Sequence, residues 1–81
     1  MNRTEALDIV KESITRVIPD ADFTALGPDD PFRDALEMDS LDFLSFVETV
    51  SERTGVRIDD EDTSKFTTLS ASADFVVAHT K

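Results

Sequence analysis

The sequence predicts an all-α fold, a four-helix bundle with three main helices, one short helix and a long first loop. Three segments carry apolar residues at the three- and four-residue spacing of amphipathic helices, and no segment shows the alternation of paired strands. Of the 81 residues, 40% are apolar, which is enough to form a core and too much for a disordered acidic chain. We expect residues 1–81 to form one domain.

The first helix is expected to begin at Asn2, because Glu5 follows three residues later in the pattern of a capping box. Apolar residues then recur at helical spacing: Leu7, Val10, Ile14, Val17 and Ile18. Pro19 should end this helix, and residues 19–38, which contain all three prolines, predict a long loop. Four apolar residues are expected to anchor that loop to the core: Phe23, Leu26, Phe32 and Leu36.

The second helix is predicted over residues 40–54, with Asp39 as its N-cap and Gly55 as its C-terminal cap. Its expected core face consists of Phe43, Phe46, Val47 and Val50. Leu41 and Leu44 should lie on a flanking face that they share with Ser40.

After the second helix, a short extended piece carries Val56 and Ile58, and Asp59 is expected to cap an acidic turn over residues 60–64. Phe66 should return to the core. A final helix is predicted over residues 68–78, with its inward residues at Leu69, Ala73, Val76 and Val77.

The net charge of −10 argues against binding to nucleic acid or anionic membranes and favours partners with basic patches. The alternative is that the charge only keeps the protein soluble. Most acids of the first half precede or surround Ser40, with Arg33 as the single base among them: Asp20, Asp22, Asp29, Asp30, Asp34, Glu37, Asp39 and Asp42. Without cysteine the chain can form neither disulfides nor a thiolate metal site. No segment resembles a signal peptide or a membrane span, so a cytoplasmic protein is expected.

Ser40 is the candidate functional residue, because its hydroxyl is placed at the start of a helix. A serine hydrolase needs a base close to the hydroxyl, and His79, the only histidine, lies near the end of the sequence. We therefore expect no catalytic site. The acidic run at residues 59–62 lacks the pattern of a calcium-binding loop, so no metal site is expected either. By position alone, Ser40 is either an acceptor for another enzyme's chemistry or part of a plain helix cap.

The segment Asp39-Ser40-Leu41, which opens the second helix after a long acidic loop, resembles the modification site of acyl carrier proteins. The resemblance covers residues 39–76 without a gap and includes the acidic cluster and Thr67-Thr68-Leu69. It implies that a separate transferase attaches 4′-phosphopantetheine from coenzyme A to Ser40, with Asp39 helping to hold the transferase's magnesium. Acyl groups would then be carried as thioesters on the arm, and the bundle could hide them between its second and third helices. Partner enzymes with basic patches would contact Leu41, Asp42, Leu44 and Glu48.

The sequence also departs from the family pattern. Glu37 stands where most members have a glycine, so the approach to Ser40 is expected to bend differently. Polar residues replace frequent carboxylates or apolar contacts at Ser45, Thr49 and Ser51, and Phe43 and Phe46 make the helix bulky. These departures favour a specialised carrier in fatty acid, lipid or polyketide biosynthesis over a housekeeping one. The carrier is expected to be a monomer. The alternatives are a peptidyl or aryl carrier, which Asp39 disfavours, and an unmodified carrier-like interaction subunit.

Overall fold

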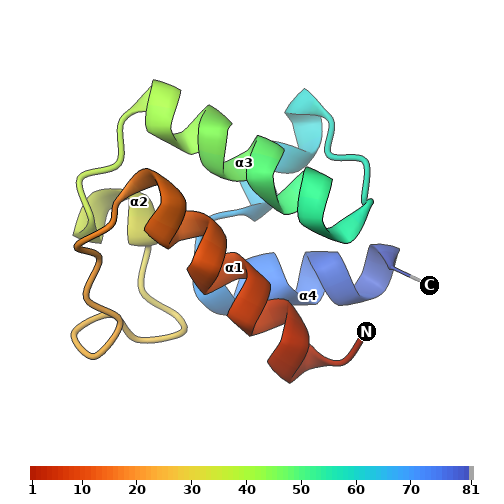
Figure 1. Cartoon of the computed structure of the whole chain (residues 1–81), viewed down its shortest axis with the longest axis horizontal. Helices are drawn as coiled ribbons and strands as arrows, with labels where there is room; N and C mark the ends of the chain where they lie inside the picture. The colour runs from red at the N-terminus through yellow and green to blue at the C-terminus, as the bar shows by residue number, and fades with distance from the viewer. Residues whose placement is uncertain (81) are drawn as a thin grey trace.

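The computed structural model describes residues 1–80, which form an all-α fold of three long and two short helical segments (Figure 1). In chain order these are α1 (Arg3–Val17), α2 (Phe32–Ala35), α3 (Ser40–Thr54), the 3₁₀ helix η1 (Asp60–Lys65) and α4 (Leu69–His79). The predicted fold class is confirmed, and the predicted second helix has the bounds of α3.

The helix caps explain why the long helices begin and end where they do. At the start of α1, Asn2 Oδ1 accepts a hydrogen bond from the Glu5 amide at 2.8 Å, as the capping pattern predicted. At the end of α3, Gly55 has a φ of +73°, a left-handed conformation that glycine adopts without steric cost. Thr68 caps α4 through its hydroxyl, which accepts from the Ala71 amide at 3.0 Å, so α4 begins one residue later than predicted.

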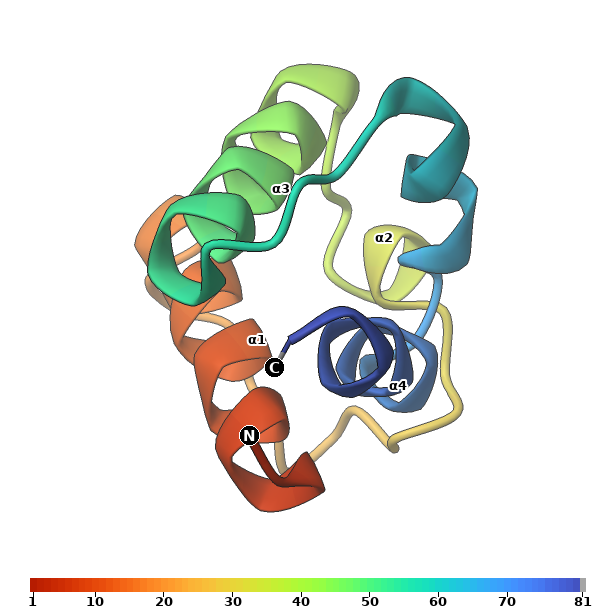
Figure 2. The same ribbon diagram turned by 90° about the vertical axis from the view of Figure 1, so that its right-hand side faces the viewer.

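Helix α1 packs against both α3 and α4. Figure 2 looks nearly along α4 and shows α1 on one side of it, with α2 and η1 on the other side. The two short helices therefore lie on the side of α4 that faces away from α1.

The core is formed by residues of all three long helices and of the connecting segments. The buried face predicted for α3 is confirmed at all four positions: Phe43, Phe46, Val47 and Val50. In α4, Leu69, Ala73 and Val76 are buried as predicted, whereas Val77 is only half-buried. Phe75, which the spacing did not identify, is 5% exposed because its ring packs against that of Phe66, with the centroids 5.1 Å apart.

The long first loop contains one element that was not predicted, the single-turn helix α2. Phe32 at its start is fully buried, and its amide donates to the Thr67 carbonyl at 3.1 Å. This bond fixes the turn to the link between η1 and α4, a contact between distant segments. The predicted loop anchors are confirmed, because Leu26 is buried as well and Phe23 and Leu36 are partly buried against the core.

Candidate modification site

Ser40 is the first residue of α3, and its side chain is exposed. Asp39 is the N-cap, as predicted, and its Oδ1 accepts a hydrogen bond from the Asp42 amide at 2.8 Å. Within residues 1–80, neither Ser40 Oγ nor the second carboxylate oxygen of Asp39 has a hydrogen-bond partner. The serine hydroxyl is therefore displayed on the surface and is not used as the helix cap.

The backbone before Ser40 makes a tight turn that normally requires glycine. The amide of Met38 donates to the Arg33 carbonyl at 2.9 Å, and that of Glu37 donates to the Asp34 carbonyl at 3.3 Å. This pair of bonds is the Schellman motif, which ends a helix with one left-handed residue. Glu37 is that residue, with a φ of +53°. The turn therefore forms with glutamate in a left-handed position that glycine adopts without steric cost, and a bend different from that of members with glycine stays a prediction.

Two buried side chains hold the backbone on either side of Ser40. Met38, two residues before it, is 5% exposed, and Phe43, three residues after it, is 7% exposed. The sequence did not identify Met38 as an anchor, because a single apolar residue in a loop carries no periodicity. Together, the two anchors hold the backbone on both sides of the exposed Asp39-Ser40 pair.

The flanking face predicted for α3 is confirmed as exposed. Leu41 is 75% exposed and Leu44 is 50% exposed, the two largest values among the large hydrophobic residues of the described chain. Glu48 is exposed on the next turn, and Asp42 is half-buried. We call Leu41, Leu44 and Glu48 the exposed α3 face. An apolar strip with acidic neighbours beside an exposed serine hydroxyl suits the docking of another protein.

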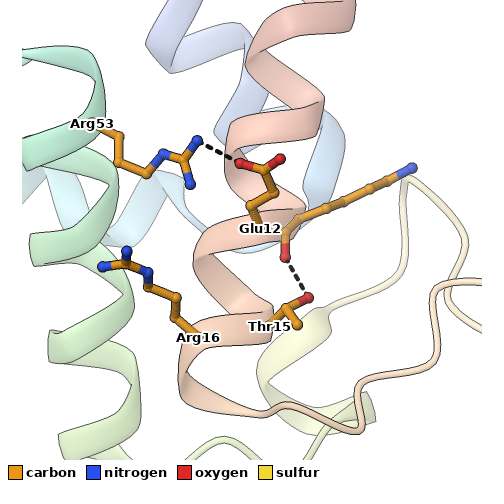
Figure 3. A pocket seen from close by; sticks show the side chains of 5 residues that line it. Glu12, Thr15, Arg16 and Arg53 are labelled. Carbon is orange, nitrogen blue, oxygen red and sulfur yellow. Dashed lines mark hydrogen bonds and ion pairs between the residues drawn. The ribbon is translucent and has the colours of Figure 1, made fainter.

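The far end of α3 has a different character. A shallow groove between α1 and α3 is lined by side chains that include Glu12, Arg16 and Arg53 (Figure 3). Arg53 forms an ion pair with Glu12, with Nη2 and Oε2 2.5 Å apart. The partner of Arg53 comes from α1, so this ion pair links two separate helices and does not follow from the sequence of α3 alone. The positive charge lies at the opposite end of α3 from Ser40.

Among residues 1–80, the single histidine lies far from Ser40. Figure 1 shows the N-terminal end of α3 and the C-terminal end of α4 at opposite ends of the molecule. His79 ends α4, where its Nδ1 lies 2.8 Å from the Phe75 carbonyl oxygen and its ring stacks on that of Phe75, with the centroids 4.1 Å apart. Over residues 1–80, no helix is long and apolar enough to cross a membrane.

Comparison with known proteins agrees with this geometry. Residues 5–76 match the family described as "Phosphopantetheine attachment site". The chain is 37% identical over 79 residues to an acyl carrier protein of Rubrobacter xylanophilus, an alignment that covers 98% of this chain and 96% of that protein. The chain therefore belongs to the acyl carrier protein family, whose members are carriers and not catalysts. Their phosphopantetheine-binding domain carries a covalently attached 4′-phosphopantetheine group.

Proposed function

We propose that Ser40 is the attachment residue for 4′-phosphopantetheine and that the chain carries acyl groups as thioesters on the thiol of this arm. The observation that supports this assignment most directly is the exposed Ser40 hydroxyl in the first turn of α3. The first amides of a helix have no carbonyl partner within it and favour an anion. A phosphodiester on Ser40 would lie beside these amides, so the residues present fit the group.

Asp39 is proposed to contact the magnesium ion of the transferase. One carboxylate oxygen is bound to the Asp42 amide and fixes the orientation of the side chain. The other has no hydrogen-bond partner within residues 1–80 and is exposed with the rest of Asp39. A carboxylate that is oriented through one oxygen and keeps the other oxygen available suits a metal ion bound by a second protein.

The exposed α3 face is proposed as the docking surface for the transferase and for enzymes that load, elongate or transfer the acyl group. Leu41 and Leu44 would supply apolar contact area, while Asp42 and Glu48 would attract basic patches on the partners. Strong negative charge opposes self-association, so we propose that the carrier is a monomer. We also propose that it acts in the cytoplasm.

We further propose a specialised carrier in fatty acid, lipid or polyketide biosynthesis, not a housekeeping one. Support comes from the surface of α3, where Ser45 and Thr49 depart from the family pattern and offer no charge to a partner. The Thr49 hydroxyl instead donates to the Ser45 carbonyl at 2.8 Å. Turnover by a dedicated partner should exceed turnover by general elongation enzymes. Equal turnover by both would contradict the specialised role.

The attachment is tested by intact mass after co-expression with a broad-range phosphopantetheinyl transferase. The chain should gain the mass of phosphopantetheine, Ser40→Ala should gain nothing, and Ser45→Ala should behave like the unaltered chain. Ser45 is a matched control, since it is an exposed serine of the same helix. A gain that persists in Ser40→Ala would contradict the assignment, and no gain with any transferase would favour an unmodified interaction subunit.

A further inference from the structure

Phenylalanine rings from α2, α3 and the residue after η1 pack against one another in the core. The ring centroid of Phe46 lies 5.2 Å from that of Phe32, 6.1 Å from that of Phe43 and 6.0 Å from that of Phe66. Phe32 and Phe46 are fully buried, and Phe66 is 1% exposed. Because protein interiors are packed as densely as organic crystals, an alkyl chain could enter here only by displacing rings.

These rings belong to four different segments and form one continuous row. Phe32 comes from α2, Phe43 and Phe46 come from α3, Phe66 follows η1, and Phe75 in α4 extends the row through Phe66. Moving Phe46 would break its contacts with three other rings at once. The interior of this bundle is therefore poorly suited to parting around a long acyl chain.

A groove outside the core lies beside α2 and close to the modification site. It has a volume of about 280 Å³ and is lined by Pro31, Arg33, Asp34, Met38 and Thr67. Met38, which forms part of this lining, is only two residues before Ser40. We call this hollow the α2 groove.

Arg33 gives the α2 groove free hydrogen-bond donors. Its Cζ lies 4.5 Å from the ring centroid of Phe43, and within residues 1–80 its guanidinium forms no ion pair. Stacking on a ring leaves the N–H groups at the edge of the guanidinium available to acceptors. The Asp34 carboxylate adds an acceptor, and Met38 supplies apolar surface. The lining suits a small group that combines oxygen atoms with a short hydrocarbon part.

We propose that this carrier holds short acyl groups bearing hydroxyl or carbonyl oxygens in the α2 groove and does not enclose long alkyl chains between α3 and η1. The inference rests on the proposed arm at Ser40, which would have to fold back along the protein to place the acyl group in the groove. Arg33 is the specificity-determining residue, since it donates to the polar acyl group and covers the outer ring of the aromatic row.

The test compares two cargoes on the same carrier. A broad-range transferase loads the chain from 3-hydroxybutyryl-coenzyme A or from octanoyl-coenzyme A, and intact mass verifies each product. Amide chemical shifts and melting temperatures are then compared with those of the carrier bearing the free arm. The hydroxybutyryl group should shift the amides of Asp34, Met38 and Thr67. The octanoyl group should leave the amides of Phe46 and Val47, and the melting temperature, unchanged.

Two arginine variants make the comparison specific. Arg33→Gln should lose the shifts caused by the hydroxybutyryl group. Arg57→Gln should retain them, since Arg57 is an exposed arginine that pairs with Asp59. Octanoyl-induced shifts of the Phe46 amide, or a raised melting temperature, would contradict the exclusion of long chains. Unshifted amides of the groove residues in the hydroxybutyryl carrier would contradict binding in the α2 groove. A chain that gains no mass would contradict the proposed function itself, independently of any chemical shift.

Discussion

Replacing Glu37 with glycine should stabilise the protein. Glu37 is held at a φ of +53° by the Schellman motif at the end of α2. A left-handed conformation costs a residue with a side chain about 1–2 kcal/mol, and glycine avoids that cost. Glycine also gives the unfolded chain more freedom, which offsets about 0.4–1 kcal/mol of the gain. The net effect should be a free energy of unfolding higher by about 0.5–1 kcal/mol.

The matched control is Glu37→Gln, which removes the same charge but keeps the strained backbone. Its free energy of unfolding should stay within about 0.5 kcal/mol of the original. The difference between the free energies of unfolding of the two variants therefore measures the cost of the left-handed backbone conformation at residue 37. For a domain of this size, a gain of about 0.5–1 kcal/mol corresponds to a melting temperature higher by about 2–8 °C.

Urea unfolding followed by far-ultraviolet circular dichroism is the appropriate assay, because the chain contains neither tryptophan nor tyrosine for fluorescence. With a urea dependence of about 1–2 kcal/mol per molar, the midpoint should rise by about 0.3–1 M in Glu37→Gly. If Glu37→Gly is no more stable than Glu37→Gln, the conformation at residue 37 is not strained and the reasoning fails.

Three further changes test the core, the charge and the exposed α3 face. Phe46→Ala should lower the free energy of unfolding by about 3–5 kcal/mol, because removing a fully buried ring with three aromatic neighbours leaves a cavity. A loss below about 1 kcal/mol in urea unfolding would contradict this packing. Added sodium chloride or magnesium should raise the melting temperature, since the net charge of −10 destabilises the compact state; an unchanged temperature would count against self-repulsion. Leu41→Asp should raise the KM of the transferase and leave the urea midpoint nearly unchanged, as the side chain is 75% exposed; an unaltered KM would remove Leu41 from the docking surface.

The features predicted correctly from the sequence are local ones. The bounds of α3, its cap at Asp39 and its left-handed end at Gly55 each depend on residue types within a few positions of one another. The four buried residues of α3 follow from helical periodicity alone. The exposed position of Ser40 follows from the same pattern, which is why the sequence alone suffices to locate the candidate site.

The features that were missed depend on contacts between distant segments. Helix α2 is too short for periodicity to reveal, and it is held by the bond from the Phe32 amide to the Thr67 carbonyl. Phe75 is buried because Phe66, nine residues earlier, meets its ring. The α2 groove also needs residues from both the first loop and the link before α4. Sequence patterns indicate which side of a helix is buried. The missed features depend on which residues of other segments pack against that side.

Glu37 connects the stability of the protein with the proposed docking function. The residue is exposed, three positions before Ser40, and it occupies a backbone position where glycine would be more stable. A charge beside the modification site can speed the approach of a basic partner, with an effect that falls as salt rises. If charge is what Glu37 contributes, Glu37→Gly and Glu37→Gln should lower the kcat/KM of the transferase equally at low salt, although only the glycine variant gains stability. If only Glu37→Gly changes the rate, the rigid turn before Ser40 matters and the charge does not.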